Sequence, residues 1–487
     1  MPLYSKFFYA SLINKDDNQV VEVYKLTDQQ ESGDSNPHVA QRETPWPSPI
    51  YSWYVVGVLM LAYTNSFIDR QILSLLVEPI RNDLDISDTQ ISLLAGLAFS
   101  VFYTVMGIPL ARLADQSNRR NIIVAGIASW SFMTALCGAA QNFWQLFLAR
   151  MGVGIGEATL SPAAFSIISD YFPKDRIARA FSVYSMGVYF GAGLALMIGG
   201  LVIKAVSAAP PVELPLIGSV YSWQLTFFAV SLLGLPILLL LFTIKEPLRR
   251  GTEAAAKSSD GATFKDLKVF IGENRWTIIW HFSAFSLLGI GIITYMIWTP
   301  TWFIRTYQWD APKIGLVYGA MTFFLGTAGV YAGGFVADWF HQRGREDAIL
   351  RATMYGGIVA IPFAIATPLM PNETLAVIGL GVTTFLLAFP QGLPAAALQV
   401  IAPNRLRAQI TALYFLVGNL IALGIGPTMV ALITDYFYGD PGMLPYSMAL
   451  VCAIVIPLGV LAVWLSLRPY RASVERSKKI ASKNSVR

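Results

Sequence analysis

The sequence predicts an all-α membrane protein with twelve membrane-spanning helices. The 487-residue chain is 55% hydrophobic and only 13% charged, with a mean hydropathy of +0.53, whereas a soluble protein carries roughly 25% charged residues. Apolar stretches of about 20 residues, the length that crosses a bilayer, recur along the chain. Each should be helical, because lipid cannot satisfy unpaired backbone groups. The predicted spans are 53–76, 91–111, 121–142, 144–169, 180–203, 221–244, 276–300, 314–336, 352–370, 374–399, 408–434 and 444–467.

Basic residues predict the orientation of these spans. If both termini are cytoplasmic, 29 of the 35 Lys and Arg residues fall in cytoplasmic segments, and only Arg81, Lys204, Arg305 and Lys313 fall outside. This asymmetry follows the positive-inside rule. We therefore expect a multi-pass protein of the cell inner membrane, whose pI of about 9.0 reflects topology and not nucleic-acid binding. The basic tail should either lie against anionic headgroups or be solvated.

Composition divides the chain into five parts. Residues 1–50 are polar and are expected to be a disordered cytoplasmic segment. Residues 51–244 and 276–467 each hold six predicted spans. The charged stretch 245–275 between them reads as a cytoplasmic linker with one surface helix. Residues 468–487 form the basic tail.

Two pairs of loops indicate that the two six-span halves are repeats. "ARLADQSNRR" (111–120) matches "GGFVADWFHQRGR" (333–345), because each has an Asp followed by arginines. "SPAAFSIISDYFPKDRIARA" (161–180) matches "LPAAALQVIAPNRLRAQ" (393–409), because each has Pro-Ala-Ala and then a Pro and two arginines. A duplicated six-helix unit is typical of transporters with a site between the halves.

These loops resemble the signature of the major facilitator superfamily. The second copy keeps Gly334, Asp338, Arg343 and Gly344, with a longer spacing between the acid and the bases. The first copy keeps Asp115, Arg119 and Arg120 but has Ala111, Gln116 and Asn118 where the family has Gly, a base and Gly. The resemblance implies that Asp115, Arg119, Arg120, Asp338 and Arg343 form conformational latches between opposite halves. The alternative is that these loops only set the topology of the chain in the membrane.

Within the superfamily the sequence resembles the spinster family, at the length of a bacterial member. The matching stretches are "FIDRQILSLLVEPIRNDLDISDTQ" (67–90) and "ARMGVGIGEATLSPAAFSII" (149–168). The resemblance implies a carrier of lysophospholipids or sphingoid phosphates. It also implies that spans 1, 4, 7 and 10 line a central cavity.

Ionisable residues within spans 1 and 4 are the main site candidates. A charge inside a membrane costs about 2.5–3.5 kcal/mol on insertion scales and suggests function. Asp69 and Arg70 are adjacent, so they point about 100° apart and need separate partners. Asn65 shares the face of Asp69. Glu157 lies about 20 Å from Trp144 along span 4, near the midplane.

We expect Arg70 to hold an anionic head group, with Asp69 and Asn65 beside it. Glu157 is the expected proton-coupling acid, and Asp69 orients Arg70 and is a second candidate for the proton. Two structural alternatives remain: a fixed Arg70–Glu157 salt bridge, or an Arg70 that snorkels outward. In the second half, Tyr295, Trp298 and Thr383 are the candidate contacts for the apolar chain, although aromatic packing explains most of span 7 equally well. His281 is expected to be structural.

Other classes of function are disfavoured. The sequence shows no zinc-ligand spacing and no Ser/His/Asp set at a common depth, so we expect neither an enzyme nor a metal or other cofactor. A channel would not explain the duplicated six-helix unit, and a ligand-sensing receptor is a minor alternative. We expect a monomeric secondary active transporter that works by alternating access, with an amphiphile, protons and membrane lipids as partners. The main alternative is a proton-coupled drug, sugar or organic-anion carrier.

Overall fold

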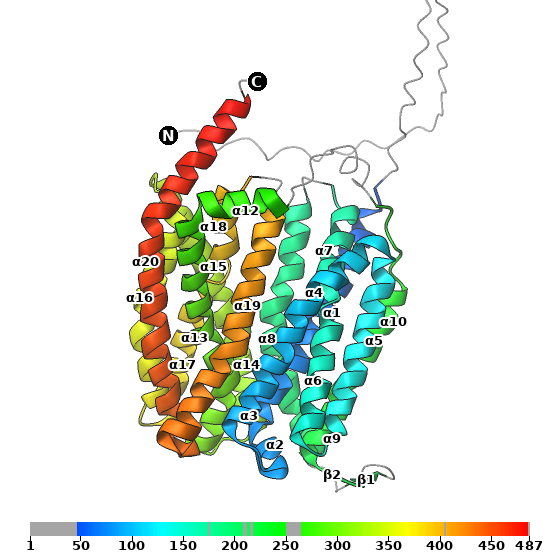
Figure 1. The fold of residues 1–487 in the computed structure, drawn as a ribbon. Helices are drawn as coiled ribbons and strands as arrows, with labels where there is room; N and C mark the ends of the chain where they lie inside the picture. The colour runs from blue at the N-terminus through cyan, green and yellow to red at the C-terminus, as the bar shows by residue number, and fades with distance from the viewer. Residues whose placement is uncertain are drawn as a thin grey trace, which may run out of the picture. The chain divides into compact units, whose positions relative to one another are not determined.

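The computed structural model describes residues 46–173, 176–207, 212–214, 218–249, 264–403 and 406–485. The first compact unit, Met1–Pro45, lies outside the described residues, and so does most of the segment 1–50 that was predicted to be disordered. The second unit, Trp46–Arg487, is built from helices (Figure 1).

The first half of the bundle follows the order of the predicted spans. Several spans consist of more than one helical segment, as the bounds show. The elements are α1 (Pro49–Leu75), α2 (Val77–Leu84), α3 (Asp88–Ser92), the π-helix η1 (Leu93–Leu97), α4 (Ala98–Gln116), α5 (Arg119–Gly138), α6 (Phe143–Glu157), α7 (Leu160–Tyr171), α8 (Ile177–Ser207), α9 (Ser222–Ser231) and α10 (Gly234–Phe242).

The second half begins after a helix in the predicted linker, α12 (Phe264–Glu273), which matches the expected surface helix. Its elements are α13 (Arg275–Tyr307), α14 (Ala311–Met321), the π-helix η2 (Thr322–Gly326), α15 (Thr327–Gln342), α16 (Ala348–Ala366), η3 (Thr367–Leu369), α17 (Glu373–Ala388), α18 (Leu393–Ile401), α19 (Arg407–Leu432), the π-helix η5 (Ile433–Tyr438), η6 (Pro441–Met443) and α20 (Leu444–Ser485).

The predicted membrane class is confirmed. Within the described ranges, 11 helical stretches are long and apolar enough to cross a membrane. Helix α1 is a further helix of 27 residues that packs along α8. It is less apolar because it carries Asn65, Asp69 and Arg70. Together these helices correspond one to one with the twelve predicted spans.

The internal repeat is visible as matching irregularities in the helices. The π-helical turns η1 and η2 interrupt the second span of each half. The fourth span of each half is also broken, between α6 and α7 and between α17 and α18. Pro162 and Pro394 lie just after these breaks, where a proline is tolerated in the first turn of a helix. Such irregular turns often occur at functional sites in helices.

The two ends of the bundle carry different elements. The end that carries α12 is called the linker end, and the end that carries α2 is called the hairpin end (Figure 1). The name comes from a two-stranded antiparallel sheet, β1 (Val212–Leu214) with β2 (Gly218–Val220), between α8 and α9. This hairpin is the one departure from an all-helical chain in the described residues. The sequence missed it because each strand has only three residues.

The two halves pack together through α8 and α14, which come from opposite halves. Glycines make this contact close: a Cβ on Gly193 would lie 2.7 Å from the carbonyl oxygen of Gly319, and a Cβ on Gly319 would lie as near that of Gly193. Phe190 and Phe323 stack beside them, with ring centroids 4.6 Å apart. Small residues at a helix crossing let the backbones approach, which is the usual basis of packing in membranes.

Candidate functional site

Asp69 and Arg70 point toward different helices, as adjacent residues on a helix must. The Asp69 carboxylate accepts a hydrogen bond from Thr134 Oγ1 of α5 at 2.8 Å. Asn65 Nδ2, one turn earlier in α1, lies 3.5 Å from its other oxygen. The Asp69 side chain is therefore engaged between α1 and α5, and does not neutralise Arg70.

Arg70 is paired instead with Glu157 of α6. Arg70 Nε donates to Glu157 Oε2 at 2.6 Å. The Glu157 side chain is fully buried, and its other oxygen, Oε1, has no hydrogen-bond partner among the described residues. The Arg70 side chain is 18% exposed, and the described residues offer its two terminal nitrogens no acceptor. The ion pair thus leaves one side of the guanidinium available.

Arg150, also on α6, supports the same cluster. Its Nη1 donates to the backbone carbonyl of Asp69 at 2.9 Å, and its Nε has no partner in the described part of the chain. Arg150 is 1% exposed. Two arginines and two acids thus gather where α1, α5 and α6 meet, and a cluster so costly to bury suggests function.

A series of aromatic rings begins at Arg70 and continues within the N-terminal half. Phe67 is followed by Tyr63, with centroids 5.4 Å apart, and Tyr63 stacks on Tyr184 of α8 at 5.0 Å. Tyr184 then meets Phe165 of α7 at 5.1 Å, and Phe165 meets Phe181 at 5.1 Å. Because Tyr63 precedes Arg70 in α1, the series leads from Arg70 toward the linker end.

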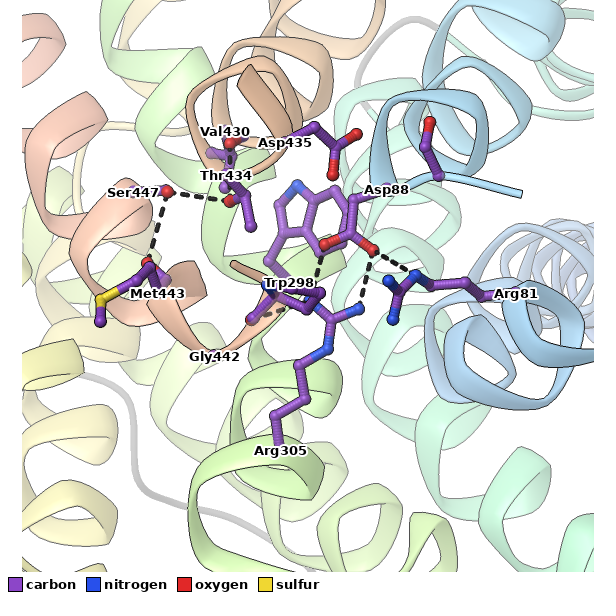
Figure 2. Close-up of polar contacts among 12 residues, drawn as sticks. Arg81, Asp88, Trp298, Arg305, Val430, Thr434, Asp435, Gly442, Met443 and Ser447 are labelled. Carbon is purple, nitrogen blue, oxygen red and sulfur yellow. Dashed lines mark hydrogen bonds and ion pairs between the residues drawn. The ribbon is translucent and has the colours of Figure 1, made fainter. Parts of the chain in front are cut away.

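A second charged cluster joins the two halves at the hairpin end (Figure 2). Arg305, near the end of α13, donates to both carboxylate oxygens of Asp88 at 2.6 and 2.7 Å and to Glu78 of α2 at 2.6 Å. Arg81 of α2 is also directed at Asp88, with Nε 3.5 Å from Oδ1. Asp88 is fully buried at the start of α3. We call these four residues the gate cluster.

Two further contacts join the halves at the same end. Asp435 of η5 accepts hydrogen bonds from both the backbone nitrogen and the hydroxyl of Thr89, each at 2.7 Å. One turn further along α3, Ser92 donates to Thr428 of α19 at 3.2 Å. Both pairs connect α3 with the second half, so α3 is fastened by charged and polar groups along its length.

The predicted latch residues lie at the linker end. Arg119 is buried and binds Asp170 at 2.5 Å and Glu246 at 2.7 Å, and the backbone nitrogen of Arg120 donates to the same Glu246 at 3.0 Å. Asp170 belongs to the first half and Glu246 to the start of the linker, so in this structure the two arginines bind no residue of the second half. The side chain of Asp115 lies outside the described residues.

The latch residues of the second half, Asp338 and Arg343, are exposed. Arg343 lies over the ring of Trp339, with Cζ 3.3 Å from the centroid. Among the latch residues whose side chains the structure describes, Arg119, Arg120, Asp338 and Arg343, none contacts the opposite half, and the latch role stays a prediction.

The candidates in the second half are buried and already paired. Tyr295 donates to the carbonyl of Ala364 at 2.7 Å, and Trp298 donates to that of Pro427 at 3.1 Å. Thr383 bonds Thr367 at 2.9 Å and is fully buried. These contacts hold α13, α16, α17 and α19 together. The structure does not bring these three residues near Arg70, and their assignment as substrate contacts stays a prediction.

Several residues of these clusters were not predicted from the sequence. Arg150 could have been found, because it is one of two bases within predicted spans. Arg305 could have been found as one of only four bases on the predicted outer side. Thr134 and the ring series carried no such signal, because polar and aromatic residues are common in spans and only the packing brings them to Asp69 and Arg70.

The comparisons with known proteins agree with this architecture. The family model described as Major Facilitator Superfamily matches residues 59–427. An MFS-type efflux pump of Mycolicibacterium smegmatis is 28% identical over 432 residues, which cover 88% of this chain and 95% of the pump. Protein spinster homolog 1 of Xenopus tropicalis is 27% identical over 446 residues, which cover 84% and 80% of the two chains.

A solved structure gives the same fold. It is described as a bacterial homolog to the human lysosomal transporter Spinster, in an inward-facing and unoccupied conformation. It is 27% identical, covers 89% of this chain and 99% of its own, and superimposes with a TM-score of 0.72. The chain therefore belongs to the Major Facilitator Superfamily of membrane transporters and is spinster-like within it.

Proposed function

We propose that this transporter carries an amphiphile with an anionic head group, such as a lysophospholipid or a sphingoid phosphate. The observation that carries the proposal is the position of Arg70, whose Nε is bound to Glu157 while its terminal nitrogens have no acceptor among the described residues. A guanidinium offers planar, charge-assisted hydrogen bonds that suit phosphate and carboxylate oxygens. Arg70 would bind the head group through these terminal nitrogens.

Proton coupling follows from competition for Arg70. Glu157 is fully buried, and Arg70 is its ion-pair partner. An anionic head group that takes over Arg70 leaves Glu157 as a charge without a counter-ion, which favours its protonation. Substrate binding and proton binding then support each other, and the coupling is reciprocal. Asp69, whose carboxylate is bound to Thr134, ties α1 to α5 next to Arg70 and in this way would keep Arg70 in position.

The apolar chain of the substrate would lie along the ring series of the N-terminal half. Tyr63, Tyr184 and Phe165 lead away from Arg70 toward the linker end, and Phe165 is 39% exposed. Apolar rings beside an anion site suit a molecule with a charged head group and an apolar chain. The prediction that Tyr295 and Trp298 of the C-terminal half also contact the chain stays a prediction. Both are buried and hydrogen-bonded in this structure, and Tyr184 of the ring series is buried as well.

Alternating access would be controlled at the hairpin end. The gate cluster and the Thr89–Asp435 contact join the halves there, and the similar spinster homolog is described as inward-facing. We propose that the linker end, together with both termini, is cytoplasmic, in keeping with the distribution of basic residues. The structure would then be a state closed to the outside, from which the gate cluster must separate.

A carrier of small organic anions is the second candidate. A probable L-galactonate transporter of Escherichia coli is 24% identical over 420 residues, which cover 83% of this chain and 87% of the relative. Arg70 could bind a sugar acid as well as a lipid phosphate. The ring series favours the lipid, because a sugar acid has no apolar chain to place there.

The test is uptake into vesicles reconstituted with the full-length protein. The panel holds lysophosphatidic acid, sphingosine phosphate, a hexuronate and a cationic drug, each measured with and without a pH gradient. The proposal expects transport of the two lipids, stimulated by the gradient. Transport of only the hexuronate, or of only the drug, would contradict the lipid proposal and assign that class of substrate instead.

A further inference from the structure

Three aromatic rings surround the Arg70 guanidinium in addition to its single acid. Arg70 Cζ lies 4.5 Å from the centroid of Phe99, 4.9 Å from that of Tyr103 and 5.0 Å from that of Phe67. Phe99 and Phe67 are buried, and Tyr103 is half-buried. Phe99 also lies under Arg150, whose Cζ is 5.9 Å from the ring centroid. We call Phe67, Phe99 and Tyr103 the aromatic cage.

The local structure explains how these rings reach Arg70. Phe67 lies one turn before Arg70 on α1, and Phe99 and Tyr103 lie one turn apart on α4, so each set shares a face. The two rings of α4 stack, with centroids 5.3 Å apart and planes 21° apart. The π-helical turn η1 ends just before α4 and sets the rotation of the helix that carries them.

A close helix crossing holds α4 against α6. A Cβ on Gly154 would lie 2.7 Å from the carbonyl oxygen of Phe99, so only glycine fits there without displacing the backbone. Gly154 lies one turn before Glu157 on the same helix. The cage and the acid are therefore fixed to each other, and Arg70 lies between them.

The rings and the acid attract Arg70 in different ways. Glu157 attracts it only while it is ionised, whereas a ring attracts a cation by its quadrupole, by about 0.5–1 kcal/mol at an exposed site and about 2 when desolvated. If Glu157 takes up a proton, the described residues leave Arg70 no other ionised partner within hydrogen-bonding distance. The aromatic cage then holds the Arg70 guanidinium toward the head-group site.

Resting on the proposed function, we propose that Phe99 and Tyr103 are positioning residues for Arg70. They hold the guanidinium in place in the proton-loaded state, in which it must bind the anionic head group alone. Their contribution is small while Glu157 is ionised and holds Arg70, and it becomes decisive once Glu157 is neutral. The cage thus sets the affinity of the transporter for anions in the state in which Glu157 is protonated.

The test compares Phe99→Leu in the wild-type background at high pH and in the Glu157→Gln background. Binding of lysophosphatidic acid and of a monoacylglycerol with the same chain is measured on the full-length protein in lipid nanodiscs. We expect Phe99→Leu to weaken lysophosphatidic acid binding about fivefold in Glu157→Gln, which corresponds to the loss of about 1 kcal/mol of cation–π attraction. We expect less than a twofold change in the wild-type background and no change for the neutral lipid.

Control variants separate the cage from ordinary packing. Tyr103→Phe and Phe99→Trp keep a ring and should bind like their parents. Phe227→Leu removes a buried ring that packs on Trp223, with ring centroids 6.1 Å apart. Its effect on lysophosphatidic acid binding should be the same with and without Glu157→Gln. An equal loss in both backgrounds, or an equal loss for the neutral lipid, would show that Phe99 only packs.

A second measurement needs no ligand and so separates this inference from the proposed substrate. In the Glu157→Gln background, thermal unfolding is measured for Phe99→Leu, for Arg70→Met and for both together. The cage predicts that the double variant loses less Tm than the sum of the single variants, because either change alone already breaks the contact. Additive losses overturn the cage, whereas failure of the wild type to bind either lipid overturns only the proposed substrate.

Discussion

Arg305 in the second half binds both carboxylate oxygens of Asp88 in the first half, at 2.6 and 2.7 Å. Such a fork-to-fork pair is among the stronger and more directional contacts between side chains. Asp88 is fully buried, so the pair is shielded from water. At the hairpin end the two halves are therefore joined by this buried pair, with Glu78, Arg81 and the Thr89–Asp435 contact beside it.

Asp88→Asn should shift the transporter toward a state that is open at the hairpin end. Asparagine removes the charge that Arg305 and Arg81 face, and loss of a hydrogen bond to a charged group weakens the closed state by about 1–3 kcal/mol. Electron–electron distances between spin labels at Trp144→Cys and Tyr436→Cys, two exposed sites on opposite halves, would report the change. The two native cysteines are buried and would be replaced by alanine.

Asp85→Asn is the matched control for the gate. Asp85 is exposed near the same end and has a positive φ of 49°, which asparagine tolerates. It should leave the label distances unchanged. A gate cluster without function would give the same distance distribution for Asp88→Asn as for the parent protein.

Arg70→Ala should abolish transport of anionic lipids while the protein still inserts into the membrane. The alanine removes the head-group contacts and leaves Glu157 as a buried acid without its cation. Arg70→Lys should restore transport only in part, because an ammonium lacks the planar fork. Uptake of an anionic and a neutral lipid would be compared, and an equal loss for both would make Arg70 a structural residue.

Arg119→Leu should destabilise the N-terminal half. Its side chain is 2% exposed and binds Asp170 and Glu246, so the substitution breaks a buried ion pair. Breaking a buried pair in this way costs about 3–5 kcal/mol. Thermal unfolding in detergent would show a lower Tm than in Arg345→Leu, which removes an exposed arginine. Equal Tm values would mean that the Arg119 contacts are not formed.

Asp115→Asn tests the predicted latch at the linker end. If Asp115 bridges the halves when the hairpin end is open, its neutralisation should loosen that state and raise the reactivity of cysteines introduced at the linker end. Thiol labelling of Ser182→Cys, an exposed position on α8, would measure this. Unchanged labelling would reduce the loop to a determinant of topology.

The fold was predictable because each of its determinants is local. Apolar length predicts the spans, and the repeated Pro-Ala-Ala loops predict the two six-span halves. The orientation that the basic residues indicate stays a prediction. The pairing of Arg70 with Glu157 was also predictable, because two costly charges at similar depth in neighbouring helices have few other partners.

The rest depends on contacts between distant segments. Nothing near Arg305 in the sequence indicates that it meets Asp88, because the two residues lie in different halves and only the packing of the halves brings them together. Phe99 and Tyr103 look like ordinary span residues until η1 and Gly154 bring them to Arg70. The buried state of Tyr295 and Trp298 could not be foreseen for the same reason, since an aromatic residue in a span suits both a packed core and a binding path.

The most direct test of the account is the pH dependence of transport in Glu157→Gln. In the proposed mechanism Glu157 carries the proton, and the anionic substrate competes with Glu157 for Arg70. The variant, reconstituted in vesicles, should still bind and exchange lysophosphatidic acid but should show no stimulation by a pH gradient and no accompanying proton flux. Transport with the wild-type dependence on the gradient would contradict the account and leave the Arg70–Glu157 pair as a structural tie between α1 and α6.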